Sequence, residues 1–69
     1  MNITYLYNRN NSKLYKVINN LKVQMWYTSK QTWGNCTTEV SEFFIVKDEV
    51  KIYQDKFDFV SERDLERYT

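Results

Sequence analysis

The stretch from Lys13 to Tyr27 constrains the fold of this chain most strongly. It predicts two strands, Lys13–Ile18 and Leu21–Tyr27, joined by a two-residue turn at Asn19-Asn20. Asparagine tolerates the positive φ that a type I′ turn requires at both central positions. The turn would give the hairpin one mostly apolar face and one mixed face, as in a half-buried antiparallel ribbon. The pairs expected on the apolar face are Ile18 with Leu21, Lys16 with Val23, and Leu14 with Met25.

The flanking segments predict further short strands and a C-terminal helix. Residues 2–8 alternate apolar and polar side chains, and a polar turn at 9–12 follows them. Residues 43–46 and 50–53 predict a second hairpin around Lys47-Asp48-Glu49, with Ile45 opposite Ile52, and residues 57–60 predict a last strand. Ser61 is expected to cap a helix over residues 62–68, because Asp64 stands at its third position.

The segment from residue 28 to residue 42 leaves alternatives open. The strand from Leu21 could run on to Gln31 or break at Ser29-Lys30, and Trp33-Gly34-Asn35 predicts a turn at the single glycine. Residues 39–44 fit either a helical turn or a strand, and we favour a strand from Phe43 onward. The whole chain, residues 1–69, therefore predicts one all-β domain. We expect a mainly antiparallel meander or a small SH3-like barrel with a short C-terminal helix.

Composition narrows the function classes. The chain has no histidine and one cysteine, Cys36, so we expect no internal disulfide, no metal site and no cofactor. No run approaches the ~20 apolar residues that span a bilayer, and the first residues lack a charged start with an apolar run. We therefore expect no membrane association and a cytoplasmic location.

Catalysis is not expected. Histidine-based triads are excluded, and one glycine cannot build a phosphate-binding loop. Four acids could in principle form a carboxylate pair, but so short a chain has little length for a water-excluding cleft. The four acids are Glu39, Glu42, Asp55 and Asp58.

For Cys36 we expect a small packed side chain rather than a reactive thiol.

Charge order is the most informative functional feature. Residues 1–38 carry five cations and no acid, whereas residues 39–69 carry nine acids and five cations, which gives a net +5 and −4. Such asymmetry between halves indicates a charged partner. The alternative is that strands from the two halves lie side by side and their charges pair across the sheet.

Two functional hypotheses use this pattern. The first is a stoichiometric binding or inhibitor protein, whose Trp and Tyr side chains anchor another protein and whose charged faces orient it. The second is a nucleic-acid-binding β-barrel module with a basic aromatic face. That face would comprise Lys13, Tyr15, Lys16, Lys22, Trp26, Lys30 and Trp33. An acidic face would comprise Glu39, Glu42, Asp48, Glu49, Asp55 and Asp58.

We favour the protein-binding hypothesis, because nine acids on so small a surface interrupt a continuous positive track. In its size and its richness in Asn, Lys and Tyr the chain resembles the small accessory proteins of phages and mobile elements. These include anti-defence proteins of the anti-CRISPR type. The resemblance implies a protein that binds and blocks a host protein, and it assigns a role to no residue. Unpaired strand edges also favour a second copy, so a homodimer is a further expectation.

Overall fold

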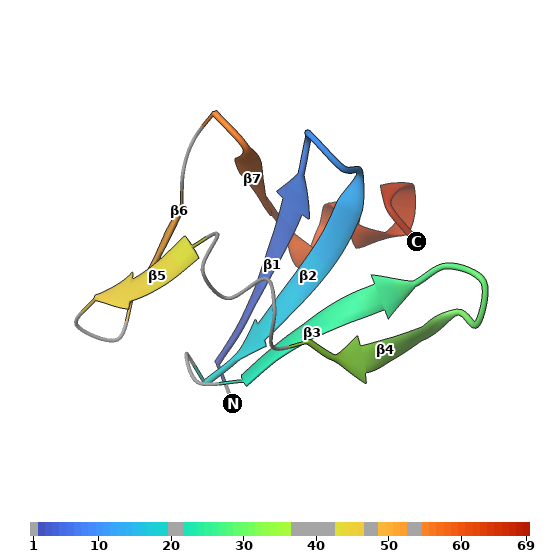
Figure 1. Cartoon of the computed structure of the whole chain (residues 1–69), viewed down its shortest axis with the longest axis horizontal. Coiled ribbons are helices and arrows are strands. Elements are labelled where there is room, and N and C mark those ends of the chain that lie inside the picture. Colours follow the sequence, from blue (N-terminus) through green and yellow to red (C-terminus); the bar gives the residue numbers. More distant parts are fainter. Residues whose placement is uncertain (1, 20–21, 37–42, 47–48, 53–54) are drawn as a thin grey trace.

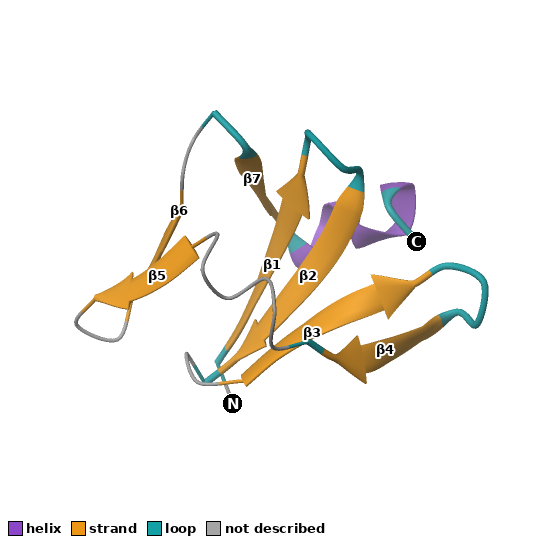
Figure 2. Cartoon of the chain, in the orientation of Figure 1, coloured by secondary structure: helices purple, strands orange, loops and turns teal. Residues whose placement is uncertain are grey.

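The computed structural model describes residues 2–19, 22–36, 43–46, 49–52 and 55–69, and these residues form seven strands and one 3₁₀ helix. The prediction of a mainly antiparallel β fold with a short C-terminal helix is confirmed (Figures 1 and 2). The elements are β1 (Ile3–Asn8), β2 (Lys13–Ile18), β3 (Lys22–Tyr27), β4 (Thr32–Asn35), β5 (Phe43–Val46), β6 (Glu49–Ile52), β7 (Phe57–Val60) and the helix η2 (Glu62–Arg67).

Strand pairing places the first half of the chain in one antiparallel meander. The five-stranded sheet has the order β4-β3-β2-β1-β7, and β5 pairs with β6 in a separate ribbon. The four strands of the first half therefore follow each other in space as they do in sequence. β7 returns from the second half and pairs with β1, so this is the junction between the two halves in that sheet (Figure 1).

The central hairpin exists, but its predicted register is wrong by one residue. Val17 lies opposite Val23 and Tyr15 opposite Met25, so the loop between the strands spans residues 19–21. Asn19 has the expected positive φ of 53°. A shift of one residue moves every side chain of one strand to the opposite face relative to its partner. Alternation could not exclude this register, because β2 carries apolar residues on both faces.

The hydrophobic core lies on one side of the sheet, which we call the core face. Its buried members are Leu6, Tyr15, Val17, Val23 and Phe57. The rings of Tyr15 and Phe57 meet edge to face with centroids 6.0 Å apart. Val50 and Ile52 of β6 pack on this cluster, so β6 contacts the core face. Met25 and Cys36 complete the packing, and Cys36 is therefore a packed free thiol, as predicted.

The opposite side of the sheet, which we call the outer face, is covered at one end by the C-terminal helix. The rings of Tyr7 and Tyr68 are tilted against each other with centroids 4.5 Å apart, and Leu14, which lies opposite Tyr7, is 3% exposed. The predicted cap is present, because Ser61 Oγ accepts a hydrogen bond from the Asp64 N–H at 3.2 Å. The helix is 3₁₀ over residues 62–67.

The segment from residue 28 to residue 35 corrects a second prediction. The chain turns at 28–31, where Gln31 has a φ of 50°, and Trp33-Gly34-Asn35 belongs to strand β4 rather than to a turn. Gly34 has a packing role there: a Cβ at this position would collide with the ring of Tyr27. A glycine in a strand often marks such a close approach.

The second hairpin is also confirmed as an element with a changed register. Ile45 pairs with Val50 rather than with Ile52, and Glu49 lies in β6 rather than in the turn. The shift is two residues, and side chains alternate with a period of two, so the same residues of β6 share a face in both registers. The predicted turn residues 47–48 lie outside the described residues.

Candidate protein-binding site

Three aromatic side chains and one lysine gather on the outer face. We call Tyr5, Lys16, Trp26 and Trp33 the aromatic patch. All four are partly exposed, and they come from β1, β2, β3 and β4, so that every strand of the first half contributes one residue. The patch is built by strand register, which puts alternate residues of each strand on the same face.

The register explains how the four side chains meet. Lys16 lies opposite Tyr5 on one side and Gln24 on the other, whereas Trp26 lies opposite Trp33. The Trp26 and Trp33 rings meet edge to face with centroids 5.2 Å apart. The centroids of Tyr5 and Trp33 are 5.9 Å apart. Three strand spacings of a flat sheet would put β1 about 14 Å from β4, so these rings must lean toward each other across β2 and β3.

Lys16 lies over one ring of this cluster, that of Trp33. Its Nζ lies 4.6 Å from the centroid of the Trp33 ring, which is within the range of a cation–π interaction. Such a contact contributes about 0.5–2 kcal/mol, depending on how far solvent is excluded. It holds the ammonium group in place and covers one face of the indole. The rim of the patch is polar, since Gln24 Nε2 donates to Asn35 Oδ1 at 3.3 Å.

The Trp26 indole leaves one hydrogen-bonding group unused. Its Nε1–H is shielded from solvent and has no hydrogen-bond partner among the described residues. A buried donor without an acceptor costs about 1–3 kcal/mol.

The structure divides the predicted basic aromatic face. Lys16, Trp26 and Trp33 meet in the aromatic patch, and Lys22 lies on the same face opposite Ile18. Tyr15 is fully buried in the core and cannot contact a partner, so its assignment to a binding face is wrong. Lys13 follows the alternation of Tyr15 and lies on the other side of β2, and Lys30 lies in the exposed turn between β3 and β4.

The predicted acidic face is placed only in part. Asp55 and Asp58 are exposed, in the turn before β7 and in β7 itself. Glu39, Glu42 and Asp48 lie outside the described residues, and for Glu49 the structure gives only its place in β6.

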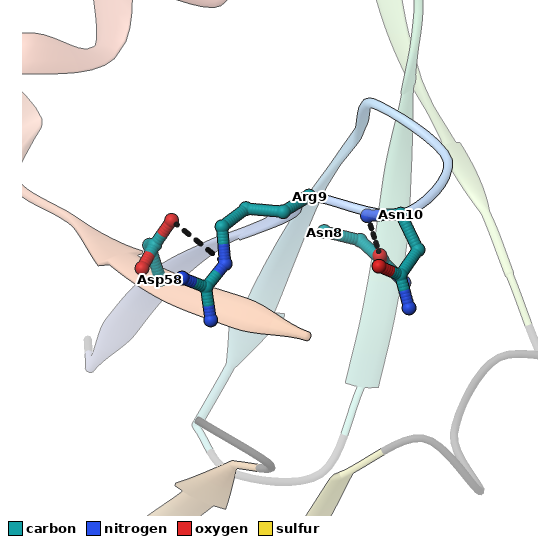
Figure 3. A network of polar contacts seen from close by, with 4 residues as sticks. All are labelled: Asn8, Arg9, Asn10 and Asp58. Atoms are coloured by element: carbon teal, nitrogen blue, oxygen red, sulfur yellow. Dashed lines mark hydrogen bonds and ion pairs between the residues drawn. The ribbon is translucent and has the colours of Figure 1, made fainter. Parts of the chain in front are cut away.

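One of these acids pairs across the junction of the two halves. Arg9 Nε lies 3.5 Å from Asp58 Oδ2, and Asn8 Oδ1 next to it accepts the Asn10 N–H at 2.9 Å (Figure 3). Charges of the two halves thus meet at the β1–β7 junction. Lys16 and Lys22 lie one and two strands away from β1, so they are further from this acid.

Tyr5 is the site residue that the sequence analysis missed. Its alternation with Ile3 and Tyr7 predicts a strand, but it gives no signal for a ring contact with β4 three strands away. The described part of the chain holds no group of three or more His, Cys, Asp or Glu residues placed to bind a metal ion. In the same part, we find no helix with the length and apolar character needed to cross a bilayer.

Comparison of the chain with protein-family models, with curated proteins and with solved structures found no match in any of the three.

Proposed function

We propose that this chain is a stoichiometric binding protein that uses the aromatic patch to contact another protein and catalyses no reaction. The observation that supports the proposal most strongly is the cluster of two tryptophans and a tyrosine, partly exposed on one sheet face with the Lys16 ammonium over the Trp33 ring. Trp and Tyr are the residues most enriched at the energetic centres of protein interfaces. Rings that are already fixed lose little conformational entropy on binding.

The geometry favours a protein over nucleic acid as the partner. Base stacking needs an open ring face, and in the patch the Trp33 ring is covered by the Lys16 ammonium on one side and bordered by Trp26 and Tyr5. A phosphate backbone needs a continuous row of cations. The lysines that the sequence offered for such a row are distributed over both sides of the sheet and the 28–31 turn.

Site-specific photo-crosslinking tests the proposal. A photoreactive phenylalanine analogue replaces Trp33 in the full chain, and it replaces Tyr27 in a control variant. Tyr27 is a partly exposed aromatic of β3 whose ring lies over Gly34 rather than in the patch. Both variants are irradiated in a nuclease-treated lysate of the source organism. We expect one protein to be linked at position 33 in a one-to-one ratio, with no product at position 27.

Two outcomes would overturn the proposal. One is equal crosslinking from both positions, because then the patch is not the contact surface. The other comes from titrating the chain with a single-stranded oligonucleotide while Trp fluorescence is recorded. Saturable quenching that weakens steeply between about 50 mM and about 200 mM salt would identify a phosphate-binding protein instead. A protein interface anchored by aromatic rings depends much less on salt, because salt screens mainly its rim.

A further inference from the structure

A groove lies along the edge of β1 that pairs with β7, just beyond the point where β7 ends. It has a volume of about 390 Å³ and is lined by residues 3–5 of β1 together with residues 59–62 at the end of β7 and the start of η2. Two of its side chains are unusually exposed for apolar residues, Ile3 at 37% and Phe59 at 57%. Tyr5 lines the groove and also contacts Trp33, so the groove is continuous with the aromatic patch.

The backbone of Ile3 presents unpaired hydrogen-bonding groups toward this groove. Asn2 O accepts the Asn19 N–H, so Asn2 faces β2, whereas Arg9 N–H donates to Lys56 O on the β7 side. Backbone groups alternate in direction along an antiparallel strand, so Ile3 faces the β7 side as Arg9 does. β7 pairs with β1 only as far as Tyr5, opposite Val60. Among the described residues, no strand therefore meets the N–H and C=O of Ile3.

The side chains that line the groove carry a negative charge. Glu62 is the one charged residue among those that line it, and no Lys or Arg lines it. Among the described residues, no cation forms an ion pair with its carboxylate. The Ser61 hydroxyl is already used, since it accepts the Asp64 N–H. The groove therefore combines an unpaired strand edge, two apolar walls and a free negative charge.

We infer that the groove binds an extended peptide segment of the partner protein, with apolar side chains against Ile3 and Phe59 and a Lys or Arg beside Glu62. The segment would add to β1 in the place that β7 vacates after Val60, and its backbone would pair with the N–H and C=O of Ile3. Main-chain hydrogen bonds of this kind provide affinity, and the side-chain pockets provide specificity. The inference rests on the proposed function, because it names the kind of segment by which the partner reaches the patch.

Peptide selection on the full chain tests the inference. Random dodecapeptides displayed on phage are selected on the immobilised protein, and the enriched sequences are synthesised and titrated by fluorescence anisotropy. We expect sequences in which apolar residues alternate around a Lys or Arg. Ile3→Pro should weaken binding about tenfold relative to Ile3→Ala, because only proline removes the outward N–H. Glu62→Gln should weaken binding several-fold, whereas Glu66→Gln, an exposed acid on the same helix, should leave it unchanged.

Two controls accompany this test: the melting of the Ile3 variants, and the effect of a substitution in the aromatic patch on peptide binding. The Ile3 N–H has no partner in the described fold, so Ile3→Pro should melt close to Ile3→Ala. If the Ile3→Pro variant unfolds, Phe59→Ser tests the same groove, because Phe59 is exposed. The Phe59→Ser variant should also bind the peptide more weakly. Acidic or absent selected sequences would overturn the inference, and so would equal affinity for Ile3→Pro and Ile3→Ala in folded protein. Peptides whose binding is lost in Trp33→Ala but kept in the groove variants would show that the groove is not the peptide-binding site, while leaving the proposed function in place.

Discussion

The register of the central hairpin can be tested with two neighbouring residues of β2. In the structure Val17 is fully buried opposite Val23, whereas Ile18 lies on the outer face and is only partly buried. In the register with a two-residue turn their environments would be exchanged. Val17→Ala and Ile18→Ala therefore give opposite rankings in the two registers.

The magnitude follows from the buried groups that are removed. Val17→Ala deletes two methyl equivalents, which amounts to about 1.6 kcal/mol of lost transfer free energy at ~0.8 kcal/mol per group. A residual cavity adds to this, at about 24 cal/mol per Å³. We expect a total loss of about 2–3 kcal/mol in the free energy of unfolding. For a domain of this size that loss corresponds to a melting temperature roughly 8–24 °C lower.

Ile18→Ala removes a larger side chain, but one that water already reaches, and we expect it to cost about 1 kcal/mol. Both variants are compared with the parent by urea unfolding monitored by circular dichroism, with the slope on urea as a check that the same surface is exposed. The reasoning is refuted if Ile18→Ala destabilises the chain as much as Val17→Ala. A reversed ranking, with Ile18→Ala the more destabilising of the two, would restore the two-residue turn at Asn19-Asn20.

Three further predictions concern single side chains. Gln31 has a φ of 50°, a conformation that costs a residue with a side chain about 1–2 kcal/mol. Gln31→Gly should therefore have a higher melting temperature than Gln31→Ala, and equal melting temperatures would show that the backbone is not strained there. Ser61→Ala should lower the free energy of unfolding by about 0.5–2 kcal/mol through loss of the helix cap, whereas Ser29→Ala in the exposed 28–31 turn should change it little. Arg9→Ala should cost less than about 1 kcal/mol because its ion pair with Asp58 is solvent-exposed, and a double-mutant cycle with Asp58→Ala giving a coupling above about 2 kcal/mol would show otherwise.

Local signals in the sequence predicted the elements well. Alternation located β1 and β7, and the Ser61-to-Asp64 spacing located the helix start, because each signal depends on side chains a few residues apart. The strands of the central hairpin were also located. Their register was not, since Leu14 and Ile18 on one side of β2 and Tyr15 and Val17 on the other are all apolar. In the fold each face of this strand has a buried apolar residue, Leu14 on one and Tyr15 and Val17 on the other, so hydrophobicity alone could not choose between them.

The candidate site depends on information that the sequence does not contain. Lys16, Trp26 and Trp33 were singled out by residue type, and they do meet, but Tyr15 was included with them and is buried. The one-residue register shift accounts for this error, because it turns Tyr15 toward the core. Tyr5 was missed because its contact with Trp33 requires a curled sheet and side chains that lean across two strands. Gly34 indicated a turn, whereas it makes room for the Tyr27 ring.

The return of β7 to β1 has a consequence for the chain as it is synthesised. The strands β1 to β4 are complete at Asn35, but the outer edge of β1 gains its partner only when Val60 has been added. At about 5–20 residues per second the interval is about 1–5 s, whereas a hairpin forms within ~1–10 μs. The nascent meander thus waits with the β7-side edge of β1 unpaired and without Phe57 in its core. During that interval this edge of β1 is open to pairing with another chain, in addition to the edge of β4 at the other end of the meander, so slower synthesis between Asn35 and Val60 should lower the yield of folded protein.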